Sequence, residues 1–77
     1  MTATRQDKAK WTATRLLWDA KRSTDTAFEQ LNSAAINFDR CGQPERGRKC
    51  LKMAGMLGGQ GIAIDDLYRQ LTAEEEQ

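Results

Sequence analysis

Two tryptophans and two arginines have the residue types and spacing best suited to recognition chemistry. Trp11 and Trp18 are seven residues apart, and Arg15 and Arg22 each follow a tryptophan by four residues. On a helix this spacing places the four side chains on one side, where a guanidinium can lie against an indole ring. Because Trp and Arg contribute much of the binding energy of protein interfaces, we interpret this set, the Trp–Arg ridge, as a candidate site for a partner protein.

Two other interpretations of the ridge remain open. The tryptophans can be core residues, covered by a later helix or by a second subunit, since large aromatic side chains favour burial. They can also be stacking platforms for the bases of single-stranded nucleic acid.

A second cluster of basic residues follows about thirty positions later, at Arg46, Arg48, Lys49 and Lys52. Arg48, Lys49 and Lys52 occupy an arc of about 100° on a short helical stretch, with Arg46 nearby. These side chains suit contact with phosphates or with an acidic partner, although a solvated helix face has the same composition. We therefore keep a nucleic-acid-binding accessory protein as the alternative function. A DNA-reading helix-turn-helix fits poorly, because the sequence between the helices also suits antiparallel packing.

Neither a catalytic nor a metal-binding set can be assembled from the sequence. It contains no histidine and only two cysteines, Cys41 and Cys50, so a zinc site lacks about two ligands. Gly55, Gly58, Gly59 and Gly61 lack the strand and the Gly-Lys-Ser/Thr ending of a phosphate-binding loop. We expect no enzyme, no cofactor and no metal.

Composition indicates one small helical domain over residues 1–77. The sequence is 39% hydrophobic and 30% charged, an ordinary globular balance, but a chain this short buries little surface. We therefore expect a thin core and a homodimer as one partner arrangement. With neither an apolar run long enough for a membrane span nor a signal-peptide core, we expect no membrane association and a cytoplasmic location.

The fold predicted to position the ridge is all-α, beginning with a long helix over about 5–39. One arc of about 120° contains most apolar residues of this segment, and the ridge lies about 160° away from Leu16, Leu17 and Ala20. The stripe keeps its phase through the weaker helix formers at 23–26, which favours one continuous helix, while a break near Ser23 is the alternative. We expect the stripe to be the core side: Ala9, Ala13, Leu16, Leu17, Ala20, Ala27, Phe28, Leu31, Ala34, Ala35 and Phe38.

Gly42 and Pro44 predict a sharp turn, with glycine past one helix end and proline in the first turn of the next helix. Two shorter helices, about 44–57 and 62–75, are then expected to pack back along the first, separated by the Gly58–Gly61 segment. All but one of the twelve basic residues precede Met53, whereas five of the eleven acidic residues follow it. The topology would place Asp65 and Asp66 near Lys21 and Arg22, and the terminal glutamates near Arg5, Lys8 and Lys10.

Residues 31–54 also carry a known pattern of large, small, aromatic and turn residues: Leu31, Ala34, Ala35, Phe38, Gly42, Gly47, Leu51 and Ala54. In this register the segment resembles a single tetratricopeptide helical hairpin. Gly59 stands where that repeat has its closing proline, and no second copy follows at the 34-residue period. The resemblance implies protein binding. With the ridge, it leads us to expect a small non-catalytic module that binds and modulates a partner protein.

Overall fold

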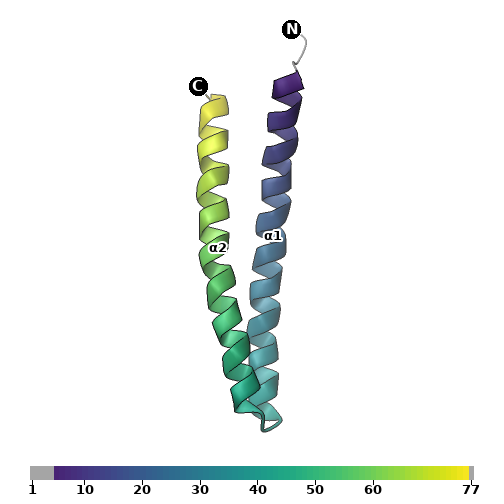
Figure 1. The fold of residues 1–77 in the computed structure, drawn as a ribbon, viewed down its shortest axis with the longest axis vertical. Coiled ribbons are helices and arrows are strands. Elements are labelled where there is room, and N and C mark those ends of the chain that lie inside the picture. The colour runs from purple at the N-terminus through teal and green to yellow at the C-terminus, as the bar shows by residue number, and fades with distance from the viewer. Residues whose placement is uncertain (1–4, 77) are drawn as a thin grey trace.

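The protein is a hairpin of two long antiparallel helices (Figure 1). A computed structural model describes residues 5–76, with helix α1 spanning Arg5–Arg40 and helix α2 spanning Pro44–Glu76. The principal extents are 62 × 17 × 13 Å, so the molecule is a rod one helix pair wide. The predicted all-α class is confirmed.

Helix α1 is continuous, as the unbroken phase of its apolar stripe predicted. It has 36 residues and passes through Ser23–Thr26 without interruption. The hydroxyl of Thr24 donates a hydrogen bond to the carbonyl of Ala20 at 2.8 Å, which satisfies this side chain inside the helix. The alternative of a break near Ser23 is therefore wrong, because α1 continues through this segment as one helix.

The predicted turn at Gly42 is confirmed in detail. Gly42 has φ +80°, a left-handed conformation that glycine adopts without the strain of a Cβ atom. The amide of Gly42 donates to the carbonyl of Asp39 at 3.2 Å, and the amide of Gln43 donates to that of Phe38 at 2.8 Å. This pair of bonds is the Schellman arrangement that ends a helix, and Pro44 then begins α2.

The predicted division of the second half into two helices is wrong. Residues 44–57 and 62–75 belong to one helix of 33 residues that continues through Gly58–Gly61. Two of these glycines face α1: an ideal Cβ on Gly58 would lie 3.5 Å from the Phe28 ring, and one on Gly61 would lie 3.6 Å from Cγ2 of Thr24. Packing against α1 therefore offsets the low helix propensity of glycine, which sequence reasoning had treated as decisive.

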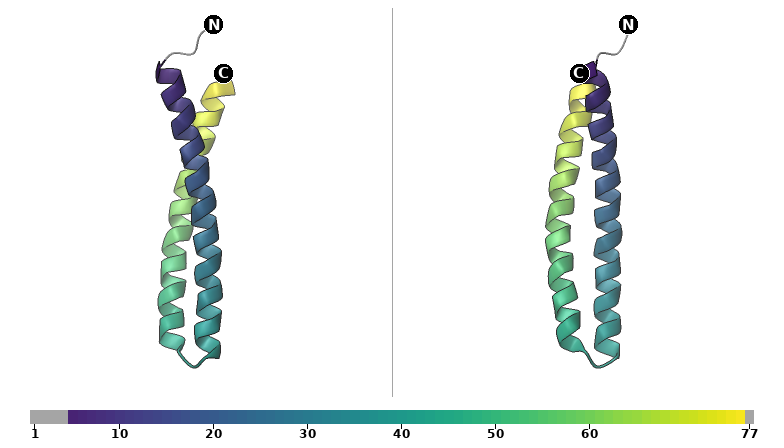
Figure 2. Two further views of the ribbon diagram at one scale, coloured as in Figure 1. Left: turned by 90° about the vertical axis from the view of Figure 1, so that its right-hand side faces the viewer. Right: turned by 45° about the vertical axis from the view of Figure 1, so that its right-hand side comes forward.

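The contact between the helices, here called the seam, repeats every seven residues in each helix. Its positions alternate three and four apart, the spacing of a coiled coil, and run antiparallel so that Gly47 lies beside Phe38 and Gly61 beside Thr24. Figure 2 shows the helices side by side near the turn and crossing toward the end that holds both chain termini, the open end. The seam residues are Thr14, Leu17, Lys21, Thr24, Phe28, Leu31, Ala35 and Phe38 of α1, and Gly47, Cys50, Ala54, Leu57, Gly61, Ile64, Tyr68 and Leu71 of α2.

The seam uses only part of the apolar stripe predicted as core. Leu17, Leu31, Ala35 and Phe38 lie in it, but Ala9, Ala13, Leu16 and Ala20 are exposed. Small residues at the turn end fix which side of α1 meets α2, and the seven-residue repeat carries that register to the open end, where Thr14, Lys21 and Thr24 take the contact positions. Among described residues only Ala35, Cys50 and Ala54 are buried apolar residues.

Candidate partner-binding face

One long side of the hairpin is hollowed along the seam, and we call it the groove face. Its hollows have volumes of about 320 Å³ near the turn, 240 Å³ in the middle and 260 Å³ at the open end. Each is lined from both helices, by the seam and by the positions that flank it on this side. The open-end hollow is lined by Trp11, Thr14, Arg15, Trp18, Tyr68 and Thr72.

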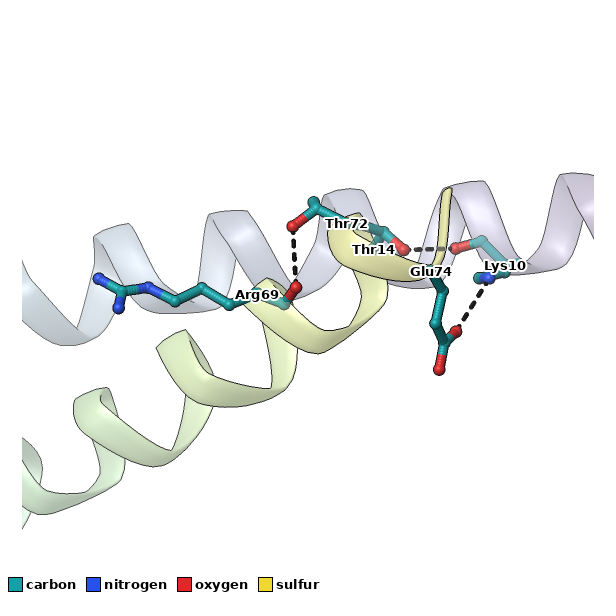
Figure 3. Close-up of polar contacts among 5 residues, drawn as sticks. All are labelled: Lys10, Thr14, Arg69, Thr72 and Glu74. Atoms are coloured by element: carbon teal, nitrogen blue, oxygen red, sulfur yellow. Dashed lines mark hydrogen bonds and ion pairs between the residues drawn. The ribbon is translucent and has the colours of Figure 1, made fainter. Parts of the chain in front are cut away.

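Three residues of the Trp–Arg ridge, Trp11, Arg15 and Trp18, line the α1 side of the open-end hollow, whereas Arg22 does not. The rings of Trp18 and Tyr68 have centroids 5.3 Å apart and are tilted by 40°, a favourable aromatic arrangement across the seam. Thr14 is buried beneath them, and its hydroxyl donates to the carbonyl of Lys10 at 2.8 Å (Figure 3). Aromatic rings therefore line one side of the hollow, and the hydroxyl of Thr14 beneath them already has a hydrogen-bond partner.

The two tryptophans have different environments. Trp18 is 42% exposed because Tyr68 shields one side of it, whereas Trp11 is 61% exposed. The guanidinium of Arg15 lies 5.7 Å from the centroid of the Trp11 ring, which is the predicted pairing. Within the chain, Trp18 is therefore partly covered, as the core interpretation expects, whereas Trp11 is not.

Trp18 has a different cation beside it from the one expected. The ammonium of Lys21 lies 5.7 Å from its ring centroid. Arg22, predicted to lie against Trp18, is exposed and makes no ion pair or ring contact within residues 5–76. Lys21 takes this place because it occupies a seam position, three residues after Trp18, where its stem is held between the helices.

The middle of the groove face carries charges of both signs. Lys21 pairs with Asp25 at 3.2 Å, and Arg69 pairs with Asp65 at 3.0 Å. Lys21 and Asp65 line the same hollow, as the expected topology required, yet each forms its ion pair within its own helix. The groove face is therefore apolar and basic at the ridge but contains carboxylates next to it.

Among the described residues, one ion pair links the two helices at the open end. Nζ of Lys10 lies 3.1 Å from a carboxylate oxygen of Glu74, and both side chains are largely exposed (Figure 3). The expected proximity of the terminal glutamates to the basic start of α1 is confirmed for this pair. Such an exposed pair contributes at most about 1 kcal/mol, so it orients the ends more than it stabilises them.

The second basic cluster lies at the turn end of α2, away from the ridge. Arg46 donates to the side-chain oxygen of Gln43 at 2.9 Å, and Arg48 lies 3.8 Å from Glu45. Lys49 and Lys52 are exposed and make no ion pair with any described residue. At 1.5 Å per residue the cluster lies about 30 Å along the rod from Arg15, so the two basic groups do not form one surface.

Sequence reasoning missed the α2 side of the open-end hollow. Neither Tyr68 nor Thr72 was among the residues predicted for a binding site. The seven-residue relation of Tyr68 to Gly47, Ala54 and Gly61 was the available signal, because it continues the seam through the glycines, and Thr72 follows Tyr68 one helical turn later.

Among the described side chains, no group of three or more His, Cys, Asp or Glu residues could hold a metal ion. Neither helix has a stretch both long and apolar enough to cross a lipid bilayer, over the same residues. No protein-family model matches the chain, and neither a curated protein nor a solved structure does.

Proposed function

We propose that this protein is a small, non-catalytic module that binds and modulates a partner protein through the Trp–Arg ridge. The observation that supports this proposal best is the open-end hollow, a depression of 260 Å³. At its edge the indole of Trp11, which is 61% exposed, lies beside the guanidinium of Arg15. A depression of this size accepts one large apolar side chain of a partner. As the sequence leads us to expect, we place the module in the cytoplasm.

The chemistry of the ridge specifies the partner segment further. Trp11 and Trp18 offer apolar contact, and Arg15 and Arg22 offer charge-assisted hydrogen bonds to a carboxylate. A partner segment with an aromatic or aliphatic residue close to an acidic residue fits both. Arg22 is suited to the acidic contact because no described residue of the chain pairs with it.

The charge pattern favours a protein over a nucleic acid. Asp25 and Asp65 lie on the groove face near the ridge, where they would repel a phosphate backbone. The second basic cluster, Arg46, Arg48, Lys49 and Lys52, lies at the other end of the rod. A nucleic acid would therefore meet two separate patches instead of a continuous basic path.

The test compares two equally exposed apolar residues on opposite sides of α1. Trp11 and Leu16 are each 61% exposed, but only Trp11 belongs to the groove face. Tagged wild type, Trp11→Ala and Leu16→Ala are used to capture proteins from the host lysate, with and without nuclease. The proposal expects a protein captured by wild type and Leu16→Ala, reduced at least about tenfold with Trp11→Ala, and insensitive to nuclease.

Far-UV circular dichroism of each variant provides the folding control, and Trp11→Ala should keep its helicity because the side chain contacts little of its own chain. Undiminished capture by Trp11→Ala rules out the ridge as the binding site. Capture that disappears with nuclease supports the nucleic-acid alternative, for which binding to an oligonucleotide should fall steeply with salt.

A further inference from the structure

The side of the hairpin opposite the groove face carries no charge over most of its length. In α1 four alanines recur every seven residues at Ala13, Ala20, Ala27 and Ala34, on the flank of the seam away from the ridge. The matching flank of α2 contains no Asp, Glu, Lys or Arg between Lys49 and Glu74. We call this surface the alanine face: Ala13, Leu16, Ala20, Ala27 and Ala34 of α1, and Met53, Met56, Gln60, Ala63 and Leu67 of α2.

The large side chains of the alanine face lie open to solvent. Leu16 is 61% exposed and Met56 is 63% exposed, and Met53 and Leu67 are each close to half exposed. The groove face also has exposed apolar side chains, but charged residues separate them. The strip along the alanine face has no charges and is apolar apart from Ser23, Gln30 and Gln60, and such a surface is typical of one that is covered in the working protein.

The chain exposes more surface than a compact monomer, by more than one side of a dimer interface would bury. The protein exposes 6319 Å², whereas a compact monomer of 8.7 kDa exposes about 4,700 Å². The excess of roughly 1,600 Å² per chain exceeds the approximately 800 Å² per partner of a standard stable interface. One hairpin has a single layer of seam residues, and a second layer of helices would supply the missing core.

We propose that a second copy of the chain packs on the alanine face, with the turns of the two hairpins at opposite ends, to form a four-helix bundle. A twofold axis across the middle of the face would then set α1 against α1 and α2 against α2, each pair antiparallel. Alanines let two α1 helices approach to the short end of the usual 8–10 Å range. Such a close approach lets the two α1 backbones contact each other over a broad area, although the alanine side chains are small.

The positions along both helices agree with a single twofold axis. The alanine series has its centre midway between Ala20 and Ala27, beside Thr24, which the seam places opposite Gly61. The uncharged flank of α2 on the alanine face is also symmetric around Gly61, because Lys49 and Glu74 bound it at nearly equal distances. The same axis therefore pairs alanine with alanine in α1 and Met56 with Leu67 in α2.

Charge complementarity selects the antiparallel arrangement. Turning one hairpin end for end brings Lys49 of each copy to Glu74 of the other, whereas no such cross-pair forms when the turns lie at the same end. Glu74 already pairs with Lys10, but a carboxylate accepts several hydrogen bonds and can serve both cations. This dimer leaves both groove faces outward, so its formation does not depend on the proposed partner site.

The test is a charge compensation inside the proposed interface. Met56→Lys and Leu67→Glu each place a charge on the alanine face, whereas Met56→Lys/Leu67→Glu pairs the two charges only between antiparallel copies. Within one helix these residues are eleven positions apart, about 16 Å, so they cannot pair in the same chain. Ile62→Lys is the matched control, because Ile62 is 66% exposed, like Met56, but lies on the groove face.

Sedimentation equilibrium of each variant across micromolar concentrations measures the dimer dissociation constant. We expect a mass twice 8.7 kDa for wild type and Ile62→Lys, a dissociation constant raised about 100-fold or more in each single variant, and a dimer restored in the double variant at low salt. Circular dichroism checks that each variant stays helical. A monomeric wild type, a dimer unaffected by Met56→Lys, a double variant that stays monomeric, or dissociation by Ile62→Lys would each overturn the proposal.

Discussion

Substituting alanine for Gly59 tests whether α2 is one helix. Gly59 lies in the middle of the glycine-rich segment, on the outer surface, and a Cβ added there meets nothing within 4 Å. In a continuous helix the only consequences are better helix propensity and a less flexible unfolded chain. Gly59→Ala should therefore raise the free energy of unfolding by about 0.5–1 kcal/mol.

Gly47→Ala should have the opposite sign. A Cβ on Gly47 would lie 3.0 Å from the carbonyl oxygen of Ala35, a backbone atom that cannot move without separating the helices. Overpacking of this kind costs about 1–3 kcal/mol, and the propensity gain of about 1 kcal/mol offsets part of it. The net loss is then up to about 2 kcal/mol, although both substitutions add the same methyl group.

Thermal unfolding followed by circular dichroism at one fixed protein concentration measures both effects. For a chain of this size, 1 kcal/mol corresponds to a shift in Tm of about 4–8 °C, so Gly59→Ala should raise Tm by about 2–8 °C. Gly55→Ala is a second control, because a Cβ there is also unobstructed. A Tm lowered by Gly59→Ala would show a left-handed or broken segment at this position and would refute the continuous helix.

Three further predictions follow from the seam and its ends. Trp18→Ala should lower the free energy of unfolding, measured by urea denaturation, by about 1–2 kcal/mol because it removes the Tyr68 contact. Trp11→Ala should lower it by less than about 0.5 kcal/mol, and equal losses would contradict the different environments of the two rings. A thiol reagent should modify the exposed Cys41 rapidly and the buried Cys50 only after unfolding, which mass spectrometry of the labelled protein would show. Rapid modification of both cysteines would mean that the turn end of the seam opens. Lys10→Ala should lower the free energy of unfolding by less than about 1 kcal/mol, and 1 M salt should remove this effect because Lys10 and Glu74 pair in solvent. An undiminished loss of stability at high salt would point to packing by the Lys10 stem.

Local signals in the sequence were sufficient for the helices and the turn. The absence of glycine and proline before Gly42 and the phase of the apolar residues predicted α1 to within one residue at its end. Gly42 and Pro44 predicted the turn because each needs a specific backbone conformation there. These predictions depend on neighbouring residues alone, and no distant contact opposed them.

Two predictions failed because a distant contact decided the outcome. Gly58 and Gly61 were interpreted as helix breakers from propensity, but they lie against Phe28 and Thr24, where a larger residue would crowd the seam. The core side of α1 was assigned from the densest apolar arc, which includes Leu16. That arc was wider than one neighbouring helix can cover, and no local pattern shows which part α2 takes.

The ridge was found from the sequence, but its surroundings were not. The pairing of Arg15 with Trp11 follows from their spacing on one helix, and the structure has it. The contact of Trp18 with Tyr68 joins residues fifty positions apart, so it needs the register of the whole seam. Sequence patterns on a single helix thus predict a set of side chains but leave open what closes the site around them.

The width of the apolar arc on α1 connects the two proposals. A single neighbouring helix needs only the seam positions, yet the arc continues from the seam onto the alanine face. If the second copy covers that face, each apolar residue of the arc has a partner, and the Trp–Arg ridge stays outside the bundle with the rest of the groove face. The stability of the hairpin would then depend on protein concentration, because dimer formation contributes to folding by mass action. The Tm of wild type should therefore rise with concentration, whereas that of Met56→Lys should be lower and independent of concentration in the same range.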